Sequence, residues 1–270
     1  MCDYTDNFRL SAENGECKIA LMSAIGDRDD QQDSASYICE DNDCMVVVCD
    51  GMGGHQGGKI ASSLATKTLI EQYKAKNPKE SISDFYVRSA IYIDKEVAML
   101  TDEAGRVMNA GSTIVSATVR NKCLYWLSIG DSRLYILRNQ ELVQVTDDHI
   151  YGHILEENWK NGVISQEEYN IGLEQKEALI SFLGINGIPK INVNEAPFSL
   201  IDSDMVVLMS DGLYKFVSDE EIKSILLNFT NIEDALDALE MKTRSFARKT
   251  GVTRDNITVA LIKIKDGGVS

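Results

Sequence analysis

Basic residues are scarce in this sequence. Its 270 residues include 27 Lys and Arg against 42 Asp and Glu, which gives a formal net charge of −15. Proteins that bind nucleic acids need a basic surface to displace counterions from phosphates, so neither nucleic acid nor an anionic membrane is expected as a partner. An acidic chain can still bind a phosphorylated molecule if metal ions or an arginine compensate the charge locally.

Long apolar runs and paired cysteine motifs are also missing. No apolar stretch approaches the roughly 18 residues of a membrane-spanning helix, and the N-terminal segment MCDYTDNFRL lacks the basic and apolar regions of a signal peptide. The six cysteines form no C-x-x-C motif, which argues against a zinc site or a disulfide framework. These absences predict a cytoplasmic protein, in which Cys44 and Cys49 face a core as reduced thiols.

Proline is rare, with three residues, and the chain has no Pro/Ser-rich linker, low-complexity tract or internal repeat. The apolar fraction of 44% and the length are sufficient for a well-buried core. We therefore expect one continuous domain over residues 1–270. The chain is also expected to act as a monomer.

Short apolar segments typical of strands alternate with segments of helical periodicity. Strands are expected at residues 19–24, 34–39, 44–49, 113–119, 123–129, 134–137, 142–145, 205–209 and 257–264. Helices are expected at residues 58–73, 83–104, 149–160, 165–180 and 233–248. Several strands are apolar on both faces and must be covered on both, which predicts two packed sheets with helices outside.

Local signals mark the ends of several segments. The polar pairs Asn121-Lys122 and Asn139-Gln140 predict tight hairpin turns. A serine followed three residues later by a glutamate predicts helices that begin after Ser165 and Ser218.

The segment VVVCDGMGGHQGGKIASS, residues 46–63, reads as a strand, a glycine loop and the start of a helix. A P-loop has the pattern G-x-x-x-x-G-K-[ST], but Ile60 follows Lys59 here, so the hydroxyl that binds magnesium is missing. A dinucleotide loop has the pattern G-x-G-x-x-G, but Gln56 stands at the third glycine. A plain turn would explain the glycines. It would not explain Asp50, which lies where the strand meets them.

Asp50 is one of four aspartates at the ends of apolar segments, and the others are Asp131, Asp211 and Asp255. A single aspartate at such a position is an ordinary turn residue. Carboxylates at the rim of an apolar core are costly, however, unless they are paired or bind metal. Adjacent strand ends can direct them into one pocket, where divalent cations relieve their repulsion. Ligands that are all oxygen favour Mg²⁺ or Mn²⁺ over Zn²⁺.

Arg28 lies among acids in the segment GDRDDQQD, residues 26–33. Taken alone, it is explained by a surface ion pair of little energetic weight. Beside a carboxylate pocket, its planar guanidinium is also suited to clamp a phosphate with two hydrogen bonds. Both interpretations stay open on this segment.

Seven short motifs, in this order, resemble those of the type 2C metal-dependent protein phosphatases in their bacterial form. They are RDDQQD at 28–33, VCDGMGGHQGG at 48–58, GST at 111–113, IGDSRLY at 129–135, TDDH at 146–149, SDGL at 210–213 and RDNIT at 254–258. Each motif is weak alone, whereas the ordered set is highly specific. The resemblance implies an α+β fold, a four-layer α-β-β-α sandwich of two antiparallel sheets flanked by helices, with a small helical flap at about residues 150–183.

The resemblance also implies an activity and a role for each acid. The chain would hydrolyse phosphoserine and phosphothreonine in proteins with a water activated by Mn²⁺ or Mg²⁺. Arg28 would bind the phosphate, and Asp131 would help to hold a third ion. Two core ions would be held by Asp50 as a bridge, the carbonyl of Gly51, Asp211, Asp255 and, through water, Asp33. The expected partners are phosphorylated proteins and a serine/threonine kinase that the chain would oppose.

Some positions depart from part of the family. Met52 stands where some members carry a histidine as general acid, which leaves His55 or water as the proton donor. Gln32 replaces a common acid of the first motif. His149 and His153 have the spacing of a helical zinc pair but lack further ligands, and a structural role is expected for His149. The alternative to an active enzyme is a regulatory or scaffold protein on the same fold, although such a protein would be expected to lose some of these aspartates or the arginine.

Overall fold

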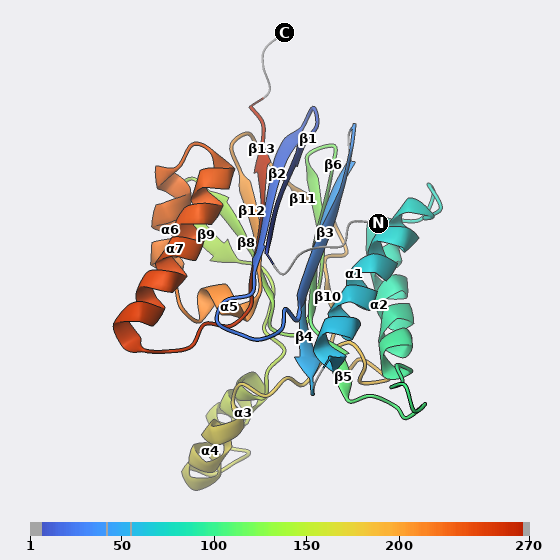
Figure 1. Ribbon diagram of the computed structural model, residues 1–270, viewed down its shortest axis with the longest axis vertical. Helices are drawn as coiled ribbons and strands as arrows, with labels where there is room; N and C mark the ends of the chain where they lie inside the picture. The colour runs from blue at the N-terminus through green and yellow to red at the C-terminus, as the bar shows by residue number, and fades with distance from the viewer. Residues whose placement is uncertain (1–6, 42, 55, 267–270) are drawn as a thin grey trace.

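The computed structural model of the chain describes residues 7–41, 43–54 and 56–266. His55, considered above as a proton donor, lies outside the described residues. Two β-sheets pack face to face in the middle of the molecule (Figure 1). Within the described residues, every pairing between strands of these sheets is antiparallel.

Each sheet mixes neighbours in sequence with strands from distant parts of the chain. The first sheet has the order β1 (Phe8–Glu13), β2 (Cys17–Ala24), β13 (Ile257–Ile264), β12 (Met205–Met209), β8 (Arg133–Arg138) and β9 (Glu141–Gln144). The second has the order β10 (Asn192–Val193), β7 (Cys123–Ile129), β6 (Ile114–Arg120), β4 (Asp43–Gly53) and β3 (Asp33–Glu40). In addition, β11 (Phe198–Ser199) pairs with β7, and β5 (Ala110–Ser112) pairs with β4.

Helices cover the outer faces of both sheets (Figure 1). The second sheet is covered by α1 (Gly57–Lys74) and α2 (Ile82–Ala98), and the first by α6 (Asp219–Asn228) and α7 (Ile232–Thr250). A short helix α5 (Asp211–Tyr214) follows β12, whereas α3 (Tyr151–Lys160), α4 (Gln166–Gly172) and the 3₁₀ turn Leu173–Gln175 project from one end of the sandwich. The predicted four-layer α-β-β-α sandwich with a helical flap is confirmed. Among the described residues, no helix has the length and apolar character needed to cross a membrane.

The central strands are apolar on both faces because each face packs against a different layer. In β4, Val46 and Val48 point between the two sheets, while Met45 and Val47 point toward α1 and α2. All four side chains are fully buried. Burying one such side chain contributes roughly 1.5–3 kcal/mol, so these strands stabilise the two-sheet arrangement and both helical layers at once.

Two predicted hairpin turns are present, between β6 and β7 and between β8 and β9. Asn121 and Lys122 have φ of 52° and 54°, and Asn139 and Gln140 have φ of 51° and 65°. Two consecutive residues with positive φ are the mark of the two-residue turn that matches the twist of paired strands, and asparagine tolerates this region well. The two predicted capping boxes, at the starts of α4 and α6, are also confirmed.

The helix predicted over residues 83–104 is too long, because α2 ends at Ala98. The following residues form a tight loop in which Thr101 pairs with Val107. The carboxylate of Asp102 accepts the backbone N–H groups of Ala104 and Arg106 at 2.9 Å each. An aspartate that binds the backbone in this way favours a turn over a helix.

The two helices predicted in the flap are also shorter than expected. α3 begins at Tyr151, so His149 precedes the helix, and the predicted helical spacing of His149 and His153 is wrong. His149 joins the stem of the flap: its N–H donates to the carbonyl of Gly130 and its carbonyl accepts the N–H of Ile180, both at 2.9 Å. Because the N–H of Ile180 is bonded to His149, it is not available for a helical hydrogen bond. The second helix, predicted to reach residue 180, ends earlier.

The fold brings four aspartates to one end of the sandwich. β12 leads directly into α5 at Asp211, and Asp255 lies just before β13, its antiparallel neighbour. In the second sheet, the register of β3 and β4 places Asp33 opposite Asp50. Sequence-distant acids therefore meet because of strand pairing.

The core between the two sheets supplies a first prediction. Leu208 on β12 is fully buried there, so we expect Leu208→Ala to lower the free energy of unfolding by about 2–5 kcal/mol in denaturant titrations. Leu227 on α6 is 45% exposed, and Leu227→Ala should cost about 0.5 kcal/mol or less. Equal losses in the two variants would contradict the assigned core.

Candidate active site

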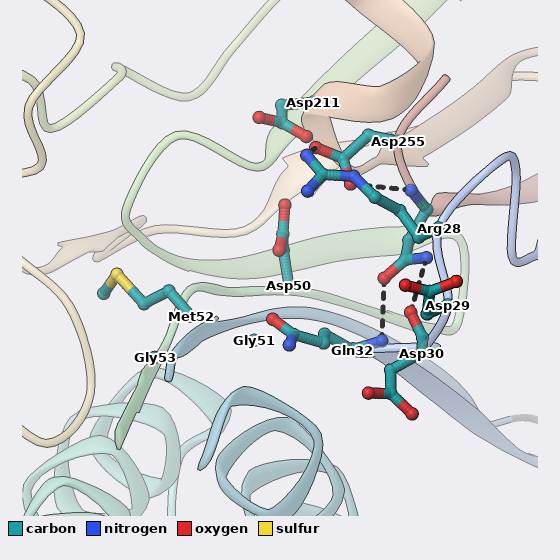
Figure 2. A pocket seen from close by; sticks show the side chains of 11 residues that line it. Arg28, Asp29, Asp30, Gln32, Asp50, Gly51, Met52, Gly53, Asp211 and Asp255 are labelled. Atoms are coloured by element: carbon teal, nitrogen blue, oxygen red, sulfur yellow. Dashed lines mark hydrogen bonds and ion pairs between the residues drawn. The ribbon is translucent and has the colours of Figure 1, made fainter. Parts of the chain in front are cut away.

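One open cavity of about 430 Å³ collects most of the predicted site residues (Figure 2). Its lining consists of Arg28, Asp29, Asp30, Gln32, Asp50, Gly51, Met52, Gly53, Asp211, Asp255 and Asn256. In Figure 2 the carboxylate of Asp50 points toward Arg28, Asp211 and Asp255, while the side chain of Met52 points away from them. Two predicted residues, Asp33 and Asp131, are buried and outside this lining.

Asp50 is held by its backbone. Its N–H donates to the hydroxyl of Thr113 at 3.0 Å, and its carbonyl accepts the N–H of Thr113 at 2.8 Å. The pKa of Asp50 lies well above its usual range, because burial removes water from the carboxylate and because the four other aspartates repel its charge. A bound cation would stabilise the ionised form of a carboxylate that is buried among other acids in this way.

Gly51 and Gly212 permit the close backbone contacts that shape the cavity. A Cβ on Gly51 would lie 2.1 Å from the carbonyl oxygen of Gly58, and a Cβ on Gly212 would lie 1.9 Å from that of Asn256. Any side chain at either position would therefore force the backbone apart. The glycines that follow Asp50 and Asp211 in the sequence are explained by this packing.

Asp211 and Asp255 each pair with a basic side chain. The Nζ atom of Lys215 lies 2.5 Å from Oδ2 of Asp211, one helical turn away along α5 and its C-terminal end. Nη2 of Arg28 donates to Oδ2 of Asp255 at 2.7 Å. The side chain of Arg28 is 56% exposed, and ion pairs this open to water have little net strength. An incoming cation or anion can therefore separate Arg28 from Asp255.

Asp33 lies behind Asp50, and its Oδ2 accepts the hydroxyl of Ser210 at 2.8 Å. Burial raises the pKa of Asp33 to about 7, although hydrogen bonds from Ser210 and Thr258 act in the opposite direction. The charges of Asp211 and Asp255 raise it further. Asp33 is thus linked to the cavity electrostatically and through the neighbouring strand.

Asp131 follows β7 and is held by a residue that the sequence did not single out. The hydroxyl of Tyr214 donates to Oδ2 of Asp131 at 3.2 Å. The guanidinium of Arg133 lies 3.6 Å from the centre of the Tyr214 ring and forms an ion pair with Asp148. Burial raises the pKa of Asp131 to about 6, and the charge of Asp211 adds to this.

Asn256 is a second residue that sequence reasoning missed. Its side-chain N–H donates to the carbonyls of Ile25 and Asp30, at 2.8 Å and 3.1 Å, and its Oδ1 accepts the N–H of Gln32 at 2.7 Å. It therefore ties the segment carrying Arg28 to the strand that follows Asp255. An asparagine next to a candidate ligand was a usable signal. Lys215, at helical spacing from Asp211, was another.

His149 is fully buried, and its Nδ1 accepts the N–H of Gly130 at 3.2 Å. Burial, together with the charge of Lys190, lowers the pKa of His149 to about 4, so the ring is neutral at physiological pH. The structural role predicted for this residue fits these contacts. His149 fixes the backbone next to Asp131 and joins it to the stem of the flap.

The acids of the cavity do not form a closed metal shell by themselves. Over residues 7–41, 43–54 and 56–266, no group of three or more Asp, Glu, His or Cys side chains is arranged to hold a metal ion. The arrangement has a physical explanation, because Arg28 and Lys215 draw two of the carboxylates to themselves. The donor set still suits hard divalent cations, since it consists of carboxylate and backbone oxygens. Arg28 and Lys215 together also compensate only part of the negative charge of the aspartates in and around the cavity.

Comparison with known protein families and sequences gives a consistent result. A family model described as Protein phosphatase 2C matches residues 22–244. The chain is 31% identical over 227 residues to the serine/threonine phosphatase stp of Listeria monocytogenes serotype 4b, covering 83% of this chain and 86% of that protein. It is 30% identical over 256 residues to protein phosphatase PhpP of Streptococcus pneumoniae serotype 2, covering 92% of this chain and 98% of that protein.

Solved structures agree with the sequences. The serine/threonine phosphatase of S. agalactiae superposes with a TM-score of 0.77 at 25% identity, covering 92% of this chain and 100% of that one. The catalytic domain of the serine/threonine protein phosphatase PstP, solved in complex with two manganese ions, gives a TM-score of 0.67 at 25% identity and covers 93% of this chain and 99% of that one.

The raised pKa values predict an unusual pH dependence of stability in metal-free protein. Asp33, with a folded pKa of about 7, is easier to ionise in the unfolded chain, where an aspartate has a pKa of about 3.9. Its contribution to stability is therefore greatest at low pH and is lost as the pH rises through 7. We expect the melting temperature in EDTA to rise as the pH falls from 8 to 6.5. Below that range the buried neutral His149 acts in the opposite direction, because its pKa is lowered.

Asp33→Asn provides the matched variant for this measurement. It should raise the melting temperature at pH 8 and flatten the profile between pH 8 and 6.5, with about 2–4 °C for each kcal/mol gained. A metal-free wild-type profile that is level, or that rises toward pH 8, would show that the aspartates do not repel one another as described.

Proposed function

The chain belongs to the protein phosphatase 2C family, and we propose that it uses the cavity around Arg28 and Asp50 to hydrolyse phosphoserine and phosphothreonine in proteins. The predictions of this family, of a protein phosphatase activity and of dependence on Mn²⁺ or Mg²⁺ are confirmed. The assignment of individual residues below is the proposal.

One observation carries the proposal: Arg28 and three aspartates from distant segments, Asp50, Asp211 and Asp255, line the same cavity. A scaffold protein has no need to keep Asp50 in a place where burial and four neighbouring acids disfavour its charge. A centre that binds divalent cations, in contrast, is built from crowded carboxylates of this kind. No observation of the described residues favours the scaffold alternative over the enzyme.

The ions would be held by oxygen atoms on the cavity wall. Asp50 would be the shared ligand, the carbonyl of Gly51 and the carboxylates of Asp211 and Asp255 would complete the core, and Asp33 would act through water. Asp131 would contribute to a third ion, with its carboxylate oriented by Tyr214. When bound, such ions lower the pKa of water and stabilise the charge that develops on a phosphate during hydrolysis.

The protein side chains then bind and orient the substrate. Arg28 releases Asp255 and turns its guanidinium to the phosphate, where two parallel N–H groups match two oxygens. The hydrogen bonds of Asn256 keep the Arg28 segment in register with Asp255 during this exchange. Water or His55, which lies outside the described residues, is left as the proton donor for the leaving serine or threonine oxygen, because Met52 has no proton to give.

The finer biological setting is part of the same proposal. Phosphoserine and phosphothreonine in proteins are products of serine/threonine kinases, so the chain opposes such a kinase. It does so as a monomer in the cytoplasm. The relatives named above, which are serine/threonine or protein phosphatases of bacteria, support phosphoproteins as the substrates.

Hydrolysis of p-nitrophenyl phosphate and of a phosphothreonine peptide tests the activity directly. We expect turnover with Mn²⁺ or Mg²⁺ and none in EDTA. Asp211→Asn should reduce it by roughly 100-fold or more, since a ligand is lost from the core. Asp234→Asn, an exposed acid at the start of α7, is the matched control and should retain full activity. Folded protein without turnover in either metal would support the scaffold alternative.

The ion pair of Lys215 with Asp211 supplies a separate prediction. Lys215→Met removes a cation that competes with metal for this carboxylate, so the affinity for Mn²⁺, measured by titration calorimetry, should rise by up to about tenfold. The melting temperature in EDTA should fall, because the acids lose a compensating charge. Lys223→Met, which removes a pair with Glu220 on α6, should change neither quantity. Weaker Mn²⁺ binding by Lys215→Met would show that Lys215 supports the metal site instead of competing with it.

A further inference from the structure

Two cysteines face each other near the turn of the β3–β4 hairpin. The strand register places Cys39 opposite Cys44, and their sulfur atoms are 2.8 Å apart. Both are free thiols. The phosphatase reaction uses neither of them, because the catalytic cavity lies at the other end of the same strands, where Asp33 is opposite Asp50.

The hydrogen-bond pattern of the hairpin decides whether a bond between the sulfurs is geometrically possible. Gly51 donates its N–H to the carbonyl of Gln32, directly across the hairpin, so this is a hydrogen-bonded pair. Bonded and non-bonded pairs alternate along antiparallel strands. Counting the register from Gln32 and Gly51 toward the turn makes Cys39 and Cys44 a non-bonded pair. Such pairs have Cα atoms about 4.5 Å apart, within the roughly 4.4–6.8 Å that a disulfide spans.

A third thiol nearby is less suited to the same bond. Cys17 on β2 is in contact with Cys44 but belongs to the opposite sheet. Facing sheets pack about 10 Å apart, which is too far for a disulfide without movement of the backbone. Cys39 is therefore the better placed partner of Cys44.

Access differs between the two facing thiols. Cys44 is fully buried between the sheets, whereas Cys39 is only partly buried at the edge of that core. A small oxidant can reach Cys39 from solvent, and Cys44 is then the nearest nucleophile. Burial raises the pKa of the Cys39 thiol, which makes its reaction slow compared with that of an exposed thiolate.

We propose that Cys39 and Cys44 are an oxidation site that hydrogen peroxide converts into a reversible cross-strand disulfide. Peroxide transfers one oxygen to the sulfur of Cys39, forming a sulfenic acid and releasing water. The sulfur of Cys44 then displaces the hydroxyl group, which leaves as a second water. Two thiols and one peroxide thus give one disulfide and two waters.

The cross-link closes the hairpin at its turn and leaves the cavity end unconstrained. It lowers the conformational entropy of the unfolded chain, so the oxidised protein should melt at a temperature about 4–8 °C higher than the reduced protein. Metal binding at Asp33 and Asp50 should be unchanged. The proposal is independent of the assigned phosphatase residues.

Peptide mapping after oxidation tests it. Native protein is treated with hydrogen peroxide, its remaining thiols are alkylated, and it is cleaved in the acidic turn between Glu40 and Asp43 with a protease that cuts at acidic residues. We expect fragments containing Cys39 and Cys44 that stay joined until dithiothreitol is added. Cys39→Ser should abolish the joined fragments and the shift in melting temperature, whereas Cys123→Ser, at a partly exposed position outside the cluster, should retain both.

Two results would overturn the proposal. One is alkylation of Cys39 and Cys44 after peroxide treatment that oxidises other thiols of the same protein. The other is a fragment that joins Cys44 to Cys17, which would mean that the two sheets move together more readily than the hairpin closes.

Discussion

Electrostatic repulsion among the aspartates at one end of the sandwich is the constraint on which the site depends. The other aspartates stay close to Asp50, because they lie on or next to strands whose register is fixed by the cores on both sides of each sheet. Burial and, after it, the charges of neighbouring aspartates raise the pKa values of Asp50, Asp33 and Asp131. The fold thus holds unfavourable negative charge that bound cations relieve, and Arg28 and Lys215 relieve part of it. The same balance makes both basic side chains replaceable by metal ions or by a substrate phosphate.

Much of the architecture could be predicted from the sequence because its signals are local. The apolar strand segments, the asparagine-led turns and the serine caps act within a few residues, and each of them was found where expected. The flap helices were predicted too long because their ends depend on a distant contact, the bond between Ile180 and His149. The strand β1 was missed because only alternate residues of it are partly buried, which leaves a weak pattern at the sheet edge.

The residues of the candidate site also divide into those that local sequence signals predict and those that depend on distant contacts. Asp50, Asp211 and Asp255 could be found because each follows or precedes a strongly apolar strand, and all three line the cavity. Tyr214 could not be assigned a role in advance, since its partner Asp131 is distant in sequence. Asn256 could be suspected from its place next to Asp255, but its distant partner Ile25 could not be foreseen. Lys215 is different, because its partner is one helical turn away, and helical spacing alone was enough to suggest the pair.

The pairing of β2 with β13 has a consequence for synthesis of the chain. These strands lie side by side over their whole length, from Cys17 with Ile264 to Ala24 with Ile257, although they come from opposite ends of the described chain. The first sheet therefore cannot close on the ribosome until β13 has emerged, and contacts of such long range slow folding. Asp255, which immediately precedes that strand, is among the last acids to join the cavity. A partly synthesised chain accordingly has no complete centre, and dephosphorylation begins only after the last strand is in place.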